Sequence, residues 1–404
     1  MKHSRWAATL VAAGIVAAGL SGCSSSSGGG SSDSLTVQDY YAEPQAGQMK
    51  AIYDSCASQL GVKINIVHVA SNGLIAKVLQ QVSSKTMPDV LMLDNPNVQQ
   101  IAASGALAPL SQFGITGDGF AKGAVSAGSY NGKLYAVPPV LNSISLFYNK
   151  DILSQAGITP PKTWDELAAD AKQLTKPGRY GFAFSAANTG EGTWTFLPFM
   201  WSNGGDETNI ATPQTAQALQ YLTGLVSSGS ASKSVVNWTQ ADVNDQFIAG
   251  KAAMMINGPW QIPALDKAGV HWASVSIPTR EAGQTVVSPL GGETFSVPNT
   301  GHSASMKKAA QFVSCLTNDQ NEATKAANED AVPSRTDAAA KFASSNPELA
   351  SFVSIVADGR SRTAQLGAKW PATETAIYTA VQAAITGEAS PQAALQQAQS
   401  QISK

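Results

Sequence analysis

The sequence is poor in charge and in the residues that bind metals. Only 13% of its 404 residues are charged, with four histidines, three cysteines and a formal net charge of −2. It has no basic run and no basic stripe interleaved with aromatic residues, which argues against a nucleic-acid partner. It also lacks zinc-type spacing, a Gly-x-Ser-x-Gly turn and a phosphate-binding loop. We therefore expect no metal, no cofactor and no catalytic residues.

Long apolar runs are missing except at the N-terminus. Lys2 and Arg5 precede the uncharged stretch 7–20, which is too short to span a bilayer comfortably. A cationic start followed by such a run is typical of a secretory signal peptide, predicted over residues 1–22. Because no later stretch reaches about 18 uninterrupted apolar residues, we expect the rest of the chain to be soluble.

The motif Leu-Ser-Gly-Cys closes this segment at Cys23, and a Ser- and Gly-rich stretch follows it. Such a composition is typical of a flexible tether, which we assign to residues 23–34. The motif resembles the lipobox of bacterial lipoproteins. The resemblance implies that Cys23 becomes the lipidated first residue and anchors the protein to the outer face of the cell membrane.

Removal of 22 residues from 404 leaves 382, which is too many for one hydrophobic core and suits two domains. Two cysteines remain, Cys56 and Cys315. An even number outside the cytoplasm favours a disulfide, and two buried free thiols are the alternative.

The pattern of apolar residues predicts an α/β fold. In the first part, strands at 35–39, 62–69 and 89–93 alternate with helices at 49–60, 73–83 and 98–104, which indicates a parallel sheet covered by helices on both faces. The later part repeats this alternation, with strands at 143–148, 180–184, 253–256, 275–277 and 295–297, and helices at 164–174, 215–227, 240–249, 304–317, 320–327, 374–385 and 390–402.

Ordered sequence blocks carry a resemblance to a known family. They lie at 88–90, 104–107, 146–151, 160–167, 202–205, 247–254, 257–260 and 393–398. Because these blocks occur in the order and at the spacing of that family, residues 35–404 resemble the carbohydrate-binding solute-binding proteins of bacterial ABC importers. This group includes the maltodextrin-binding proteins.

The resemblance implies two α/β lobes joined by a hinge that the chain crosses more than once. The expected first lobe is 35–141 plus 292–336, and the second is 142–291 plus 337–404. This division places both remaining cysteines in one lobe and favours their pairing. Gly291 and Gly292 lie at a crossing, where their backbone freedom suits either a hinge or a simple turn.

The implied function is capture of a sugar, from mono- to oligosaccharide, between the lobes. A monomeric, lipid-anchored protein would deliver it to membrane permease subunits served by a cytoplasmic ATPase. One alternative is the same fold binding a non-sugar solute such as a glycerophosphodiester, a polyamine or a ferric ion. A secreted glycan-active enzyme is a further alternative.

A sugar site needs aromatic faces for C–H groups and polar groups for hydroxyls. Trp260 and Trp194 match family positions of stacking aromatics, while Trp238 and Trp370 are further candidates. Each tryptophan has core packing as its alternative, and core packing is what we expect of Trp164 and Trp201.

Polar candidates lie at strand ends, where parallel sheets bind their ligands. Asp94 and Asn95 follow a buried strand, with a helix N-cap as the alternative for Asn95. By resemblance, Asn142, Glu293 and Arg335 point toward the ligand, and a structural salt bridge is the alternative for the last two. Of Tyr40 and Tyr41, one should face the cleft and the other the core.

Overall fold

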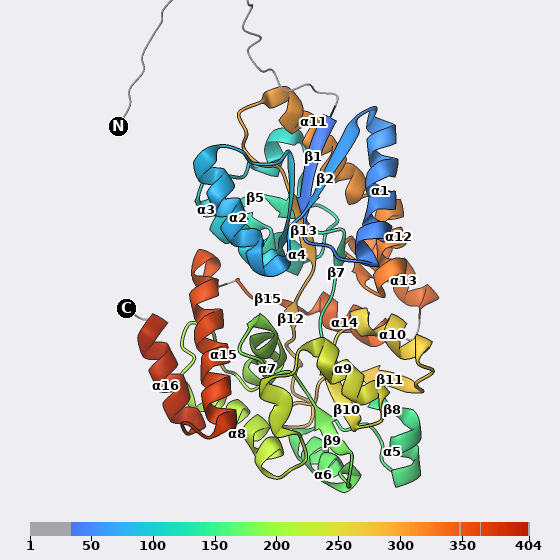
Figure 1. Ribbon diagram of the computed structural model, residues 1–404, viewed down its shortest axis with the longest axis vertical. Helices are drawn as coiled ribbons and strands as arrows, with labels where there is room; N and C mark the ends of the chain where they lie inside the picture. Colours follow the sequence, from blue (N-terminus) through green and yellow to red (C-terminus); the bar gives the residue numbers. More distant parts are fainter. Residues whose placement is uncertain (1–33, 347–348, 364, 403–404) are drawn as a thin grey trace, which may run out of the picture.

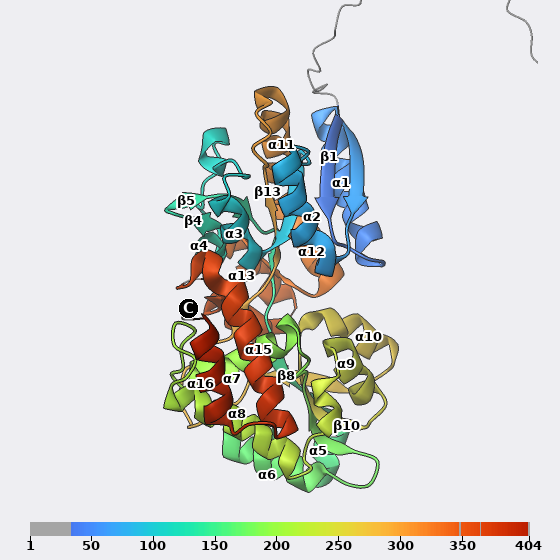
Figure 2. The same cartoon turned by 60° about the vertical axis from the view of Figure 1, so that its left-hand side comes forward.

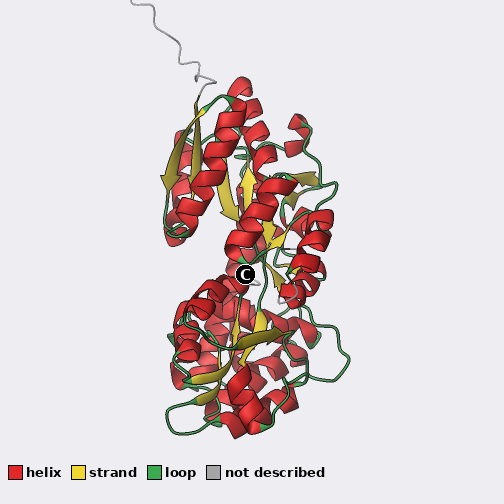
Figure 3. Ribbon diagram, turned by 90° about the vertical axis from the view of Figure 1, so that its right-hand side faces the viewer, coloured by secondary structure: helices red, strands yellow, loops and turns green. Residues whose placement is uncertain are grey.

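The computed structural model describes residues 34–346, 349–363 and 365–402, and these form two lobes stacked along the long axis (Figure 1). Lobe 1 is built on a five-stranded sheet with the order β2-β1-β3-β13-β6, and lobe 2 on a four-stranded sheet with the order β11-β8-β10-β9. Helices surround both sheets (Figure 3). The predicted two-lobed α/β fold is confirmed. The predicted signal peptide, Cys23 and nearly all of the tether lie outside the described residues.

The sheet of lobe 1 is mixed rather than wholly parallel. β1 (Ser34–Asp39) pairs in parallel with β2 (Lys63–His68) and β3 (Val90–Asp94). β13 (Glu293–Ser296), however, runs antiparallel to β3 and to β6 (Ala136–Val137). The reason is that the chain returns from lobe 2 at the carboxyl end of β3 and runs back along it, so the predicted all-parallel sheet is wrong at this strand.

Helices cover lobe 1, and a disulfide joins two of them. Cys56 of α1 and Cys315 of α11 are bonded, and Tyr53 packs on Phe295 and Phe312 nearby. The helices of this lobe are α1 (Gln45–Leu60), α2 (Ser71–Ser84), α3 (Val98–Ala103), α4 (Lys122–Ala127), α11 (Ser303–Leu316) and α12 (Asp319–Glu329), and a hairpin is formed by β4 (Ser129–Tyr130) and β5 (Lys133–Leu134).

The sheet of lobe 2 contains β8 (Ser145–Asn149), β9 (Tyr180–Ala183), β10 (Ala252–Asn257) and β11 (Trp272–Val275). β8 is antiparallel to both β10 and β11, whereas β9 and β10 are parallel. The helices of this lobe are α5 (Lys150–Ala156), α6 (Trp164–Leu174), α7 (Gly190–Ser202), α8 (Pro213–Ser227), α9 (Gln240–Ile248), α10 (Ile262–Lys267), α15 (Trp370–Thr386) and α16 (Pro391–Ile402).

Local signals explain two of these helix starts. Thr163 and Glu166 form the predicted capping box of α6. α15 begins at Trp370, four residues before the predicted start, because Pro371 is well tolerated in a first helical turn. Figure 2 shows α15 and α16 side by side on lobe 2, with the beginning of α15 reaching lobe 1. None of the described helices has the length and apolarity that crossing a membrane requires.

Three connections join the lobes. The first runs from β7 (Val140–Leu141) to β8, the second from β12 (Pro289–Leu290) to β13, and the third follows β14 (Val332–Pro333) through α13 (Thr336–Ser345), α14 (Ala350–Ala357) and β15 (Arg360–Ser361). β12 pairs with β15, and β14 pairs with β7. α13 packs against α12 of lobe 1 and also against α14 of the third connection, so this packing does not decide where one lobe ends and the other begins. The exact lobe boundaries therefore stay a prediction.

A glycine pair forms the second connection. Gly292 has a φ of 132°, and a Cβ there would lie 2.5 Å from the carbonyl oxygen of Val140. A Cβ on Gly291 would lie 2.1 Å from Oδ1 of Asn142 and 2.7 Å from Cη2 of Trp194. Gly292 therefore requires glycine, because its φ is positive and the backbone of the neighbouring strand is too close for a Cβ, whereas a side chain at Gly291 would displace the side chains of Asn142 and Trp194.

Candidate functional site

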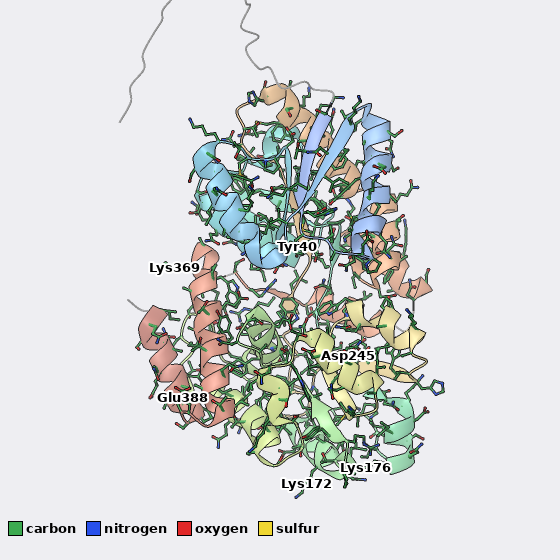
Figure 4. The ribbon with its side chains drawn as sticks, in the orientation of Figure 1. Tyr40, Lys172, Lys176, Asp245, Lys369 and Glu388 are labelled. Atoms are coloured by element: carbon green, nitrogen blue, oxygen red, sulfur yellow. A yellow bond between two sulfur atoms is a disulfide. The ribbon has the colours of Figure 1, made fainter. Side chains whose placement is uncertain are left out.

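Polar side chains gather where the strands of lobe 1 end against lobe 2. Asp94, the last residue of β3, pairs in register with Glu293, the first residue of β13. The Tyr40 hydroxyl donates a hydrogen bond to Oε1 of Glu293 at 3.3 Å, and Figure 4 places Tyr40 at the end of lobe 1 that faces lobe 2. Tyr41 is only 4% exposed and packs in the lobe 1 core. Tyr40 is thus the member of the tyrosine pair that lies at the junction.

A buried ion pair lies behind these residues. Lys325 Nζ is 2.5 Å from Oε1 of Glu329, and it lies 4.6 Å from the ring centroid of Tyr41. Burial raises the pKa of the Glu293 carboxyl, while the positive charge of Lys325 lowers it. The net effect is a raised pKa, so the Lys325 ammonium opposes the effect of burial on Glu293 only in part.

Arg362 is the residue that connects the two lobes most directly, and the sequence analysis missed it. Its Nη2 donates to both carboxylate oxygens of Asp94 at 3.0 and 3.1 Å. Its guanidinium carbon lies 4.4 Å from the ring centroid of Trp194 in α7, and its Nη1 is 3.8 Å from Oε1 of Glu374 in α15. Asp94 comes from lobe 1 and the other two from lobe 2, so Arg362 holds the junction together.

Glu374 joins this group from lobe 2. Burial raises the pKa of its carboxyl, and the neighbouring Arg362 charge opposes that shift. Together, Tyr40, Asp94, Glu293, Arg362, Glu374 and Trp194 form what we call the junction cluster. The cluster combines carboxylates from both lobes with a guanidinium and the ring of Tyr40, and this chemistry suits a polar ligand.

Asn95 and Asn142 serve the connections between the lobes. The Asn95 side chain is buried and donates to the carbonyl oxygen of Leu290 in β12 at 3.0 Å. It does not cap a helix, so the N-cap alternative is wrong. The backbone of Asn142 exchanges two hydrogen bonds with Gly291, at 3.2 and 2.8 Å, and its side chain lies beside that glycine.

Arg335 lies apart from the junction cluster, which corrects the expectation that it points toward the ligand with Glu293. Its Nε donates to the carbonyl oxygen of Thr317 and lies 3.8 Å from Glu322, while its guanidinium stacks on Phe120. Burial raises the pKa of Glu322 to about 7, against the opposing effect of hydrogen bonds from Ser334 and Arg335. The structural salt bridge, the alternative considered for Arg335, is the arrangement observed.

The four candidate tryptophans have different surroundings. Trp370 is 1% exposed and lies in the lobe 2 core, so it presents no ring face to a ligand in this structure. Trp194 is also buried, beneath Arg362. Trp238 and Trp260 are half-buried against the core of lobe 2. Trp164 and Trp201 are core residues, as predicted.

Trp260 is the candidate that the strand order places near the junction. It follows β10 directly, and its ring lies against Gly258. The last residue of β10, Asn257, pairs with Ser145, the first residue of β8 after the connection from lobe 1. Trp260 therefore lies at the end of the lobe 2 sheet from which the chain crosses to lobe 1.

Comparison with known proteins places the chain in a family. A family model described as bacterial extracellular solute-binding protein matches residues 51–351. A binding protein of Brucella abortus is 26% identical over 383 residues, with 90% of each chain covered. A maltooligosaccharide ABC transporter solute-binding lipoprotein of Streptococcus pneumoniae is 24% identical, covering 86% of this chain and 83% of its own.

Solved structures agree with the two-lobed fold. Maltose-bound MalE3 of T. maritima has a TM-score of 0.81 at 22% identity, covering 92% of this chain and 99% of its own. The cyclic α-maltosyl-1,6-maltose binding protein of Arthrobacter globiformis has a TM-score of 0.78 at 26% identity, covering 91% and 97%. The chain therefore belongs to the bacterial extracellular solute-binding protein family.

Proposed function

We propose that this protein captures a sugar, from mono- to oligosaccharide, between its two lobes and delivers it to the permease subunits of an ABC importer. The junction cluster is the observation that carries the proposal, because it combines carboxylate acceptors from both lobes with a guanidinium donor. The names of the relatives from Streptococcus pneumoniae and Arthrobacter globiformis, which refer to sugar oligomers, support it further.

The chemistry of the junction cluster suits a polyhydroxyl ligand. The Glu293 carboxylate accepts a hydrogen bond from Tyr40 at its Oε1, and a carboxylate can accept further bonds from sugar hydroxyls. Trp260 supplies a partly exposed indole whose negative ring face suits the C–H face of a sugar. These residues thus address the hydroxyl groups and one C–H face of a sugar.

The connections between the lobes provide the means of capture. A ligand that touches both lobes favours the closed arrangement only to the extent that it binds that arrangement more tightly. Gly291 and Gly292 lie in one of these connections, and Asn142 in another pairs with Gly291. We infer that these residues absorb the change in backbone angles when the lobes move.

The membrane anchor is a separate part of the proposal, supported by the lipobox-like motif at Cys23 and by the word lipoprotein in the name of the pneumococcal relative. Replacing Cys23 with serine should release the protein into the medium, because the acylated sulfur is lost. Immunoblotting of membrane and medium fractions measures this. Retention of the Cys23→Ser protein in the membrane fraction would contradict the anchor.

Replacing Trp260 with alanine should weaken sugar binding by at least about 2 kcal/mol, or about 30-fold, since buried aromatic anchors dominate binding energy. Isothermal titration calorimetry with the best-binding sugar measures the change.

Trp272→Ala is the matched control. Trp272 is a half-buried tryptophan of the same lobe, but it pairs with Asn149 at the opposite end of β8. Its replacement should leave the affinity unchanged. Equal affinities for the Trp260 variant and the wild type would place Trp260 in the packing and not in the site.

A further inference from the structure

Arg362 covers the ring of a tryptophan that would otherwise be a stacking surface. Its guanidinium carbon lies 4.4 Å from the ring centroid of Trp194, and both side chains are more than nine-tenths buried. A guanidinium packs on the face of an indole ring, and the C–H face of a sugar would need that same surface. One of the aromatic surfaces at the junction is therefore already occupied by the protein itself.

The position of Arg362 is fixed by bonds to both lobes. Asp94 receives two hydrogen bonds from Nη2, and Asn95 Oδ1 lies 3.4 Å from the same nitrogen. Its Nη1 lies 3.8 Å from Glu374 of α15. Hydrogen bonds between a guanidinium and a carboxylate are stronger than hydrogen bonds between neutral groups. A ligand would have to displace Arg362 from these bonds to reach the face of Trp194.

Two hydrogen-bond donors beside this stack have no acceptor among the described residues. They are Nε of Arg362 and Nε1 of Trp194, and both atoms are buried. Buried donors in native structures are normally paired, so each unpaired donor calls for an explanation. Both atoms are closed to solvent in this arrangement, so an acceptor from a ligand reaches them only when the Arg362 side chain or the lobes move.

We propose that Arg362 sets the length of the ligand by taking the place of one sugar ring on Trp194. The inference rests on the proposed function, because it assumes that the junction cluster binds sugar. A mono- or disaccharide is then the longest ligand that does not need the covered face of Trp194. A longer oligosaccharide needs the surface that the guanidinium covers.

The test compares Arg362→Ala with the wild type across two series of sugars, glucose to maltotetraose and galactose to its β-1,4-linked tetramer. Titration calorimetry gives the affinity for each member. The wild type should bind one or two rings most tightly. In the variant, the ratio of trisaccharide to disaccharide affinity should rise by about tenfold, because an aromatic surface becomes available.

Two further variants keep the test decisive. Arg362→Lys retains a charge toward Asp94 but loses the planar face, so it should shift the ratio in the same direction and remains informative if the alanine variant does not fold.

Arg360→Ala is the control, since Arg360 also stacks on a tryptophan, Trp201, at 4.8 Å. Arg360 pairs with Asp206 and Glu207 instead of with the junction cluster, and its removal should leave the ratio unchanged.

The inference is overturned if the wild type prefers three or four rings, or if both Arg362 variants keep the wild-type ratio. Failure of the proposed function gives a different result, because then no sugar of either series binds to the wild type at all.

Discussion

Replacing Lys325 with methionine should lower the free energy of unfolding by about 3–5 kcal/mol, because it leaves a buried carboxylate without its partner. The Lys325 side chain is 1% exposed and that of Glu329 is 8% exposed, and the two are 2.5 Å apart. The ammonium also lies over the ring of Tyr41. Methionine fills a similar volume, so the loss reports on charge more than on packing. Urea unfolding at neutral pH measures it.

The chain offers a matched control for this prediction. Lys50 and Asp54 have the same spacing and the same 2.5 Å distance, but their side chains are 61% and 55% exposed. Lys50→Met should therefore change the stability by no more than about 0.5 kcal/mol. The double variant Lys325→Met with Glu329→Gln should regain part of the loss, because the Glu329 carboxylate is no longer left without its partner. Equal effects at Lys325 and Lys50 would contradict the account of the buried pair.

Replacing Cys56 and Cys315 together with alanine should destabilise lobe 1 by about 2–5 kcal/mol, the usual range for removing a native disulfide. The two cysteines are 259 residues apart in sequence, so the bond restricts a very long loop in the unfolded chain. The bond also fastens α1 to α11 on one side of the sheet. Chemical unfolding with and without a reductant measures the contribution.

The reductant separates the bond from the packing of the cysteines. Dithiothreitol should lower the stability of the wild type and leave that of the double variant unchanged. A wild type that is insensitive to the reductant, and whose unreduced unfolded form has two reactive thiols, would rule out the disulfide.

Local signals in the sequence were sufficient for much of the fold. Alternation along β1 predicted that one of the two tyrosines after it faces the core, and Tyr41 does so. The capping box at Thr163 fixed the start of α6. These predictions succeeded because burial and capping depend on residues close in sequence, whose periodicity is visible without the fold.

Features that depend on distant segments could not be predicted. Arg362 gains its role from Asp94, Trp194 and Glu374, which come from three separate parts of the chain, and no motif surrounds it. The surroundings of Arg335 could not be predicted for the same reason, because Glu322 and Phe120, which contact its guanidinium, are distant from it in sequence or in a separate element. The antiparallel pairing of β13 follows from where the chain returns to lobe 1, which no local pattern encodes.

The central claim, capture of a sugar between the lobes, is tested most directly by a thermal-shift screen of the chain from residue 24 onward. The ligands are mono-, di- and trisaccharides, with glycerophosphodiesters and spermidine for comparison. A ligand present at about 100 times its dissociation constant should add about 2.7 kcal/mol of stability, which is a readable shift. The account predicts a shift with one group of sugars. No shift with any sugar, together with a shift by a charged solute, would contradict it.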